Sequence, residues 1–436
     1  MTEFRVKPGG HLRGRIRVPG DKSISHRAVM LTSVANGTGR IHGLLTGRDV
    51  MATARAFQAM GVDMEFGDGG TLSIRGAGRF GLRAPEGDLD LGNSGTAIRL
   101  LAGLLCGQRF ESRLVGDESL SRRPMKRVTD PLGEMGANID TSEDGTPPLA
   151  IHPVDTLAGI RYRLPVASAQ VKSALLLAGL YAEGPVCVSE PAPLRDHTER
   201  MLAGLGVRVD VEGDWICVTA GDLVAADIHV PGDFSSAAFF TVGGLIAPGS
   251  ELTMTHVGVN PTRTGLLQVL REMSGDIRLE NERLVAGEPV ADLVVRSSTL
   301  TGVDIPPEVV PLAIDEFPII CVAAALAEGT TRIRGAGELR HKESDRIHAM
   351  AVGLETLGVD VEESEDGLII RGRDELGGGT VDSFTDHRIA MAFSIAGLRA
   401  GASVTVLNTG NVATSFPDFE ARARELGLGL TATERS

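Results

Sequence analysis

A sixfold internal repeat constrains the fold more than any other feature of this sequence. Six segments each open on a helix-capping residue, continue as a largely apolar helix and close on glycine, with successive starts 72, 75, 65, 82 and 71 residues apart. Asp, Asn and Ser accept hydrogen bonds from the free N–H groups at a helix start, so each segment predicts a helix. The predicted starts are Asp21, Asn93, Ser168, Asp233, Asp315 and Asp386.

A second sixfold pattern lies between these segments. Each copy has an apolar helix end, one small residue and an alternating strand, as in LETLGVDVE from Leu354. Glycine suits the left-handed conformation that ends many helices, and period-two alternation indicates a half-buried strand. Each repeat therefore holds two helices and several short strands. The small residues are Gly61, Gly136, Gly206, Ser274, Gly358 and Gly427.

The repeats predict an α/β (α+β) protein with two domains of three repeats each. Segments such as DEFPIICVAAALA, from Asp315, are apolar nearly all round, which is typical of a helix buried on every side. We therefore expect an inside-out α/β barrel in each domain, with parallel helices inward and strands outside. The tripeptide PGD occurs at 19–21 and at 231–233 and indicates two crossings between domains. One domain would comprise residues 1–18 with 232–436, and the other residues 19–231.

The charge balance argues against a nucleic-acid surface. The chain has 43 Lys and Arg against 57 Asp and Glu, a net charge of −14, with 13 Phe, 2 Tyr and 1 Trp. Nucleic-acid surfaces rely on basic patches and aromatic stacking platforms. No nucleic-acid partner is expected, and any anionic ligand must be held by a local cluster of cations.

Membrane, targeting and metal signals are not apparent in the sequence. The longest uncharged run, residues 400–417, is shorter and more polar than the roughly 20 apolar residues of a membrane span. Residues 1–10 do not resemble a signal peptide, so we expect a cytoplasmic protein without membrane association. The cysteines lack metal-ligand spacing and predict neither a disulfide framework nor a zinc site. They are Cys106, Cys187, Cys217 and Cys321.

Cationic and polar residues gather at the predicted helix starts. These starts carry partial positive charge and free N–H donors, so inward helices whose N-termini meet would form an anion site. Guanidinium groups suit phosphate and carboxylate, and Asp315, Glu343, Lys22 and His387 are candidates for proton transfer. The gathered residues include Lys22, Ser23, Arg27, Arg99, Arg122, Arg123, Ser168, Gln170, Arg195, Arg263, Lys342, Arg346, His387 and Arg388.

Several of these residues also have a purely structural interpretation. Lys22 would ordinarily be a solvated group after a helix cap, and Arg123 and Arg346 would be surface charges at helix ends. Asp315 could cap a buried helix, and Glu343 could be a first-turn acid that favours the helix dipole. Only the joint pattern favours function.

Ten ordered motifs resemble the 5-enolpyruvylshikimate-3-phosphate synthase family, and some are similar to its bacterial class II subgroup. The resemblance implies two domains, each of three βαβαββ units, with the active site in the interdomain cleft. It implies transfer of the enolpyruvyl group of phosphoenolpyruvate to the 5-hydroxyl of shikimate 3-phosphate, a step of the shikimate pathway, by addition and elimination through a tetrahedral intermediate. The motifs are PGDKSISHR, LGNSGTAIR, SLSRRPM, SAQVKSALLLAGL, RDHTE, NPTRTG, IDEFPI, LRHKESDR, DHRIAM and TSFPDF.

The resemblance also implies a role for each matching residue, with no metal, no cofactor and a monomeric chain. Asp315 is similar to the base on the 5-hydroxyl, Glu343 and Lys22 to the groups that handle protons, and His387 to a supporting neighbour. The implied contacts of shikimate 3-phosphate are Lys22, Ser23, Arg27, Ser168, Ala169, Gln170, Arg195, Asp315 and Lys342. The implied contacts of phosphoenolpyruvate are Lys22, Gly95, Arg123, Gln170, Arg346 and Arg388.

Two positions depart from the family pattern, and a third leaves inhibitor response open. Thr414 stands where many relatives carry a lysine, which puts one phosphate contact in doubt, and Leu100 stands where others carry proline. Gly95 leaves room for the inhibitor glyphosate, since a larger alanine there is linked to tolerance in some relatives. The class II motifs suggest tolerance instead.

Two rival functions remain for comparison. The related enolpyruvyl transferase that acts on UDP-N-acetylglucosamine typically has a loop cysteine and an asparagine after its N-terminal lysine, where this chain has Asp117 and Ser23. The second rival is a noncatalytic anion-binding or RNA-end-processing protein of the same architecture, which would bind nucleotides. The scarcity of aromatic residues argues against it.

Overall fold

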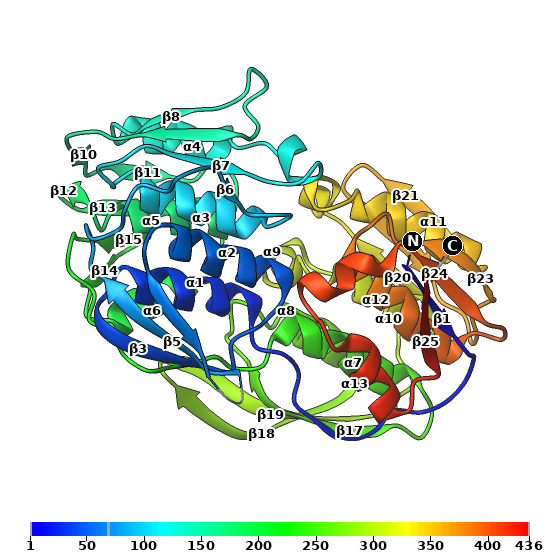
Figure 1. Ribbon diagram of the computed structural model, residues 1–436. Coiled ribbons are helices and arrows are strands. Elements are labelled where there is room, and N and C mark those ends of the chain that lie inside the picture. The colour runs from blue at the N-terminus through cyan, green and yellow to red at the C-terminus, as the bar shows by residue number, and fades with distance from the viewer. Residues whose placement is uncertain (1, 68–69, 435–436) are drawn as a thin grey trace. The chain divides into compact units, whose positions relative to one another are not determined.

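The computed structural model describes residues 2–67 and 70–434, which form two compact units (Figure 1). One unit comprises Met1–Pro19, Pro231–Leu284 and Pro289–Ser436. The other comprises Gly20–Val230 together with the short segment Val285–Glu288. We call them the outer-chain unit and the inserted unit. None of the helices in the described ranges combines the length and the apolar character that crossing a lipid bilayer requires.

The inserted unit packs its most apolar helices inward. Helices α1 (Lys22–Ser33), α3 (Gly95–Leu105) and α5 (Ala169–Ala178) are buried along most of their length, and α3 packs against both α1 and α5. Helices α2 (Arg48–Ala59), α4 (Lys126–Glu134) and α6 (His197–Gly204) alternate with them along the chain. One contiguous apolar core, which includes Leu101 and Leu175, joins the helices to the sheets.

Three four-stranded sheets surround these helices, each with one parallel pair and two antiparallel pairs. The first sheet has the order β16 (Ile228–His229), β3 (Asn36–His42), β5 (Leu72–Ala77) and β4 (Asp63–Phe66). The second has the order β6 (Leu89–Asp90), β7 (Ser112–Val115), β9 (Leu149–His152) and β8 (Asn138–Asp140). The third has the order β11 (Arg161–Arg163), β13 (Val186–Ser189), β15 (Trp215–Val218) and β14 (Val209–Glu212). A small parallel pair joins β10 (Leu157–Ala158) to β12 (Ala182–Glu183).

The outer-chain unit repeats this plan. Helices α7 (Phe234–Ile246) and α10 (Phe317–Ala325) are buried at every residue, and α12 (His387–Ala396) at all but one. These three pack against one another, while α8 (Gly265–Glu272), α11 (Arg346–Thr356) and α13 (Phe419–Leu426) follow in alternation, and the short α9 (Val310–Ala313) packs against α8. A helix apolar all round has no face to present to water, so strands and outer helices must enclose it. The predicted inside-out α/β architecture is confirmed.

Three sheets also enclose the helices of the outer-chain unit. One has the order β18 (Asp276–Val285), β19 (Glu288–Arg296), β17 (Glu251–Gly258) and β2 (Arg13–Ile16). Another has the order β20 (Thr330–Ile333), β22 (Gly367–Arg371) and β21 (Asp360–Ser364). The last has the order β23 (Gly379–Asp382), β24 (Val404–Leu407), β1 (Thr2–Val6) and β25 (Leu430–Glu434).

Four of the six predicted helix starts act as N-caps through their side chains. They are Asp21, Ser168, Asp233 and Asp386, whose side-chain oxygens accept from backbone N–H groups of the first turn. The prediction was wrong at the other two starts: α3 is capped by Ser94 rather than Asn93, and the cap position of α10 is Glu316 rather than Asp315. At α3 the side chain of the neighbouring Ser94 accepts from the Ala97 N–H, whereas Glu316 at the cap position of α10 makes no capping hydrogen bond through its side chain.

All six small residues of the second pattern take the left-handed conformation. Their φ angles lie between 71° at Ser274 and 107° at Gly427. They terminate the second helix of each repeat, where a positive φ lets the chain turn into the following strand. The predicted helix ends are confirmed.

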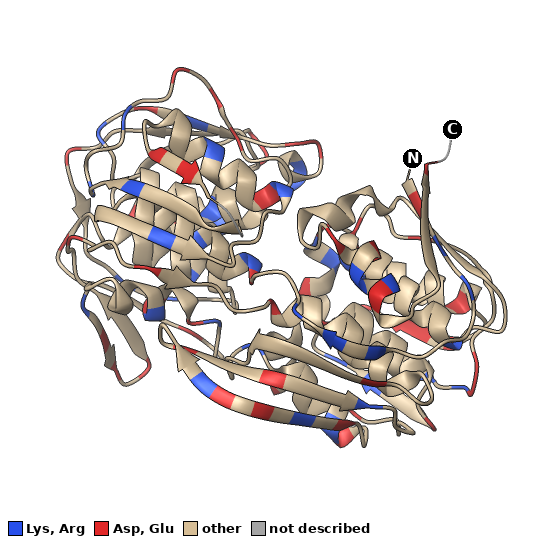
Figure 2. Cartoon of the chain, turned by 60° about the horizontal axis from the view of Figure 1, so that its bottom comes forward, with Lys and Arg blue, Asp and Glu red and all other residues tan. Residues whose placement is uncertain are grey.

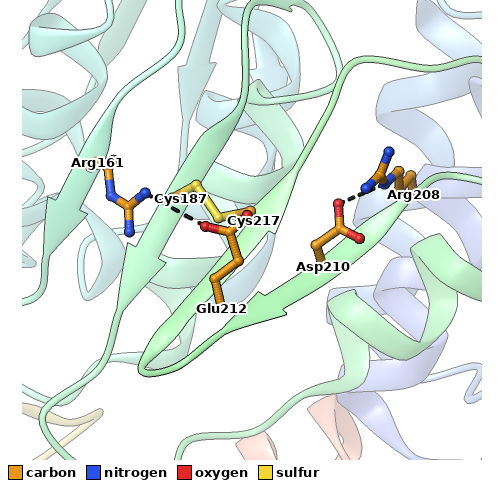
Figure 3. Close-up of a disulfide and its surroundings, with 6 residues drawn as sticks. All are labelled: Arg161, Cys187, Arg208, Asp210, Glu212 and Cys217. Carbon is orange, nitrogen blue, oxygen red and sulfur yellow. Dashed lines mark ion pairs between the residues drawn. A yellow bond between two sulfur atoms is a disulfide. The ribbon is translucent and has the colours of Figure 1, made fainter.

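The prediction that the cysteines form no disulfide was wrong. Cys187 on β13 and Cys217 on β15 are directly paired across the antiparallel ladder and form a disulfide (Figure 3). Their Cα atoms are 4.0 Å apart, although the residues are 30 positions apart in sequence. Figure 3 also shows two exposed ion pairs beside the bridge, Arg161 with Glu212 and Arg208 with Asp210. Cys106 and Cys321 are free and buried.

Candidate active site

Basic and acidic residues are interspersed along the chain of both units, as Figure 2 shows. A net negative chain that binds anions must therefore gather cations locally. The predicted site residues form two groups, one in each unit, and we describe each group within its own unit.

In the inserted unit, α1 brings Lys22 and Arg27 to its N-terminal half. The Lys22 ammonium lies 2.5 Å from the Asp49 carboxylate and is only 20% exposed, so it is not a solvated surface group. The Arg27 guanidinium is buried and donates to Thr198 Oγ1 at 2.7 Å, to Ser173 Oγ at 2.7 Å and to the Ser23 carbonyl at 2.9 Å. These acceptors reduce the cost of burying a guanidinium.

Electrostatics distinguish two neighbouring residues of α1. Burial lowers the pKa of Arg27 to about 10, an effect that the Glu199 carboxylate opposes. Burial, and then the charge of Lys22, lower the pKa of His26 to about 3, so its imidazole is neutral at physiological pH. The ring nitrogens of His26 lie 2.8 Å from Thr53 Oγ1 and 3.4 Å from Ser94 Oγ, which places His26 behind the cap of α3.

The start of α3 brings together three predicted contacts of phosphoenolpyruvate. A β-carbon added to Gly95 would lie 3.0 Å from the nearest guanidinium nitrogens of Arg123 and of Arg99. Arg99 donates to Gln170 Oε1 at 2.6 Å, and the Gln170 amide donates to Thr96 Oγ1 at 3.0 Å. Gly95, Arg123 and Gln170 are therefore neighbours around Arg99, with no side chain at Gly95 to fill the space.

The remaining predicted residues of the inserted unit stand at two further helix starts. Ser168 caps α5, Ala169 is its first residue and Gln170 its second. Arg195 lies two residues before α6, and its charge contributes to the lowered pKa of Arg27. Helix starts expose N–H groups that suit anionic ligands.

In the outer-chain unit, Asp315 is shared by two arginines. Its carboxylate oxygens lie 3.5 Å from Arg346 Nη1 and 3.7 Å from Arg388 Nη2, and Arg388 also donates to the Asp315 carbonyl at 3.0 Å. Asp315 lies one residue before the cap position of α10, which Glu316 occupies.

Arg346 is the most enclosed cation of this group. Its guanidinium is 1% exposed and is bound by Asp386 at 2.8 Å and Glu343 at 2.6 Å. Burial opposes its charge, but Asp386, Glu343 and Asp315 outweigh that effect and raise the pKa of Arg346. The surface interpretation of Arg346 was wrong. The first-turn interpretation of Glu343 was also wrong, since Asp345 caps α11 and Glu343 precedes it.

Three more residues complete this group or lie near it. Burial lowers the pKa of the Lys342 ammonium, which Asp315 opposes. His387 is buried at the first position of α12, directly after the cap Asp386. Thr414, at the position where relatives carry lysine, is buried and donates to the Asn411 carbonyl at 2.7 Å.

Sequence reasoning left Arg99 and Asp386 out of the predicted contacts. Arg99 lies four residues after Gly95 on α3 and shares its face, so helical spacing could have identified it. Asp386 was predicted only as a cap, but it also holds Arg346. Within the described ranges, no group of three or more His, Cys, Asp and Glu side chains is placed to hold a metal ion.

Comparisons with known proteins cover nearly the whole chain. A sequence model described as EPSP synthase (3-phosphoshikimate 1-carboxyvinyltransferase) matches residues 6–422. The chain is 59% identical over 430 residues to the 3-phosphoshikimate 1-carboxyvinyltransferase of Alkalilimnicola ehrlichii, covering 98% of this chain and 96% of that one. It is 58% identical to the protein of that name from Methylococcus capsulatus, with 98% of each chain covered.

Two solved structures share the fold. An EPSP synthase from Acinetobacter baumannii superposes with a TM-score of 0.90 at 49% identity, covering 100% of both chains. The enolpyruvyl transferase NikO from Streptomyces tendae superposes with a TM-score of 0.80, covering 100% of this chain and 99% of that one, and at 18% identity this similarity concerns the fold alone.

Proposed function

The chain belongs to the EPSP synthase family, and we propose that the two residue groups described above bind its substrates and carry out its chemistry. The reaction is the transfer of the enolpyruvyl group of phosphoenolpyruvate to the 5-hydroxyl of shikimate 3-phosphate, with release of phosphate, in the shikimate pathway. Both substrates are phosphorylated, and phosphoenolpyruvate also carries a carboxylate.

The chemistry requires proton transfers in both of its stages, addition and elimination. The methylene carbon of phosphoenolpyruvate takes a proton, which makes the neighbouring carbon electrophilic, and the 5-hydroxyl loses its proton as its oxygen attacks. The resulting tetrahedral intermediate then loses phosphate and a methyl proton. In our proposal Asp315 accepts the hydroxyl proton, and Glu343 and Lys22 handle the protons of the methylene group and the phosphate. His387 supports them.

Binding roles follow the same division. We assign shikimate 3-phosphate to Lys22, Ser23, Arg27, Ser168, Ala169, Gln170, Arg195, Asp315 and Lys342. We assign phosphoenolpyruvate to Lys22, Gly95, Arg123, Gln170, Arg346 and Arg388. The position of Asp315 between Arg346 and Arg388 carries the proposal, since it sets a candidate base beside two cations that suit an anionic substrate.

Phosphate release tests the proposal directly. The protein is incubated with phosphoenolpyruvate and either shikimate 3-phosphate or UDP-N-acetylglucosamine, and inorganic phosphate is measured over time. We expect release with shikimate 3-phosphate. Release only with the nucleotide sugar would assign the chain to the other transferase activity, and release with neither would leave an anion-binding protein.

The expected domain composition, location and assembly are part of the same proposal. We propose domains of three repeats each, spanning 1–18 with 232–436 and 19–231, in a cytoplasmic monomer. Sedimentation equilibrium at several protein concentrations tests the monomer: a single species of about 45.8 kDa is expected.

A further inference from the structure

A fully buried lysine lies directly behind the proposed shikimate 3-phosphate contacts. Lys172 on α5 has a side chain that is 0% exposed, two residues after Gln170. Its ammonium lies 2.7 Å from Glu190 Oε2 and 2.6 Å from Glu199 Oε1. Glu190 follows strand β13, and Glu199 lies in the first turn of α6. The Lys172 ammonium group therefore connects three separate segments of the inserted unit.

The first carboxylate connects this lysine to the loop that presents Arg195. The second oxygen of Glu190 accepts from the backbone N–H of Leu194 at 3.0 Å. Residues 190–194 thus form a loop closed by the same side chain that Lys172 binds. Arg195 follows immediately, so the position of its backbone depends on Glu190.

The second carboxylate, that of Glu199, connects Lys172 to the buried hydroxyl groups that bind Arg27. Ser173 and Thr198 are the chain neighbours of Lys172 and Glu199, and their hydroxyls lie 2.8 Å apart and both accept from Arg27. The Lys172–Glu199 ion pair and the Ser173–Thr198 hydrogen bond are therefore adjacent interactions that connect α5 to α6. Helix α6 packs against both α1 and α5 in the unit (Figure 1).

We propose that Lys172, Glu190 and Glu199 are positioning residues for shikimate 3-phosphate: by tying α5 to α6 and to the 190–194 loop, they fix Ser168, Arg195 and Arg27 in one binding geometry. This inference rests on the proposed function. None of the three is a catalytic residue, because each acts through a group that would touch the substrate. Gln170 is also held by Arg99 and Thr96 from α3, so the phosphoenolpyruvate side depends less on this cluster.

Stability alone does not account for the cluster. Taking charges out of water is costly, and replacing a complete buried ion network by uncharged groups of similar volume is often neutral or stabilising. Directional ion pairs instead fix the register between elements, which is what a multi-point anion site requires. The two explanations make different predictions for a variant in which all three charges are removed.

The triple variant Lys172→Met, Glu190→Gln and Glu199→Gln separates these explanations. It keeps side-chain volumes, and the amide introduced at position 190 can still accept from the Leu194 N–H, but one positive and two negative charges are removed. The local charge becomes less negative, so a purely electrostatic effect would tighten binding of a phosphorylated ligand. We expect weaker binding of shikimate 3-phosphate, on the order of 10-fold, because the groups are no longer held in register.

Calorimetric titration with shikimate 3-phosphate alone and steady-state kinetics provide the measurements. The KM for phosphoenolpyruvate should stay within about twofold of the wild-type value. Leu177→Ala is the matched control, since Leu177 is buried in the last turn of the same helix and its removal destabilises α5 without touching the charges. Glu190→Gln alone, at the most exposed member, serves if the triple variant does not fold.

The outcomes distinguish a failure of this inference from a failure of the proposed function. Unchanged or tighter binding of shikimate 3-phosphate by the folded variant would refute it. An equal loss in Leu177→Ala at a matched melting temperature, or an equal rise in both KM values, would also refute it. Wild-type protein that fails to bind shikimate 3-phosphate at all would instead refute the proposed function.

Discussion

Replacing Asp315 by Asn should separate catalysis from binding in this protein. The change keeps the volume and one oxygen acceptor but removes the proposed base. Asp315 is 17% exposed at its side chain, so water has limited room to take its place. A positioned general base contributes about 10²- to 10⁴-fold to a rate, or roughly 3–5 kcal/mol of transition-state stabilisation. We therefore expect kcat to fall by about 10²-fold or more.

The surroundings of Asp315 give the expected sign of the effect on binding. Arg346 keeps Asp386 and Glu343 as partners, and Arg388 keeps its hydrogen bond to the carbonyl of residue 315. Loss of one negative charge makes this group more cationic, so the KM for phosphoenolpyruvate should stay the same or fall. Because Arg346 keeps two carboxylate partners and Arg388 keeps its carbonyl acceptor, the free energy of unfolding should change by only about 1 kcal/mol.

Steady-state kinetics and urea unfolding of the same preparations test this reasoning. Asp304→Asn is the control, since Asp304 lies on the same unit, is 68% exposed and pairs with the exposed Arg332. An unchanged kcat in Asp315→Asn would remove the residue from catalysis. A kcat loss accompanied by an equally large rise in the KM for phosphoenolpyruvate would indicate that Asp315 only positions Arg346 and Arg388.

Three further predictions concern the inserted unit. Gly95→Ala should raise the KM for phosphoenolpyruvate several-fold and leave the KM for shikimate 3-phosphate unchanged, since the added carbon would lie 3.0 Å from the movable guanidinium groups of Arg99 and Arg123. A glyphosate titration of the wild-type protein and the variant then tests whether Gly95 admits the inhibitor. The double variant Cys187→Ala and Cys217→Ala should lower the free energy of unfolding by about 3–4 kcal/mol, because the disulfide closes a loop between residues 30 positions apart. Unfolding is followed by Trp215 fluorescence without reductant, and equal stability of the two proteins would contradict the disulfide. The free energy of unfolding should fall as the pH drops from 6.5 toward 3, because His26 has a pKa of about 3 in the folded protein and of about 6.5 in the unfolded chain. Urea midpoints measured at several pH values test this, and His26→Asn should flatten the pH dependence.

The repeat made most of the fold predictable because the same local sequence signals, for helix starts and helix ends, occur six times. A residue that caps a helix or takes a positive φ is selected by nearby backbone geometry, and six copies of each signal average out single errors. The errors at Asn93 and Asp315 are shifts of one residue: Ser94 caps α3 through its side chain, and Glu316 stands at the cap position of α10 without a capping hydrogen bond. Such shifts matter for the candidate site, since Asp315 lies just outside the helix that it was predicted to cap, with its carboxylate beside Arg346 and Arg388.

The position of several candidate site residues at helix starts was predictable for the same local reason. Lys22, Gly95, Gln170 and Arg388 stand within two residues of a helix start, and the periodicity of the repeats locates those starts. The hydrogen bond from Arg99 to Gln170 was not predicted, because Gln170 lies 71 residues away on a different helix. Helical spacing places Arg99 beside Gly95, but it does not say which residue of α5 faces it.

The cross-strand disulfide and the buried Lys172 cluster belong to a class that a single sequence does not reveal. Cys187 and Cys217 meet only because β13 and β15 pair in one particular register, and a shift of one residue would place them on opposite faces. Lys172 lies in a run that reads as an ordinary apolar helix, and its partners come from a strand end and another helix. A lysine inside an inward helix is nevertheless a local anomaly, because a buried ammonium requires carboxylate partners. A charged residue within an otherwise apolar helix therefore indicates that oppositely charged partners lie nearby in the fold, even when the sequence does not identify those partners.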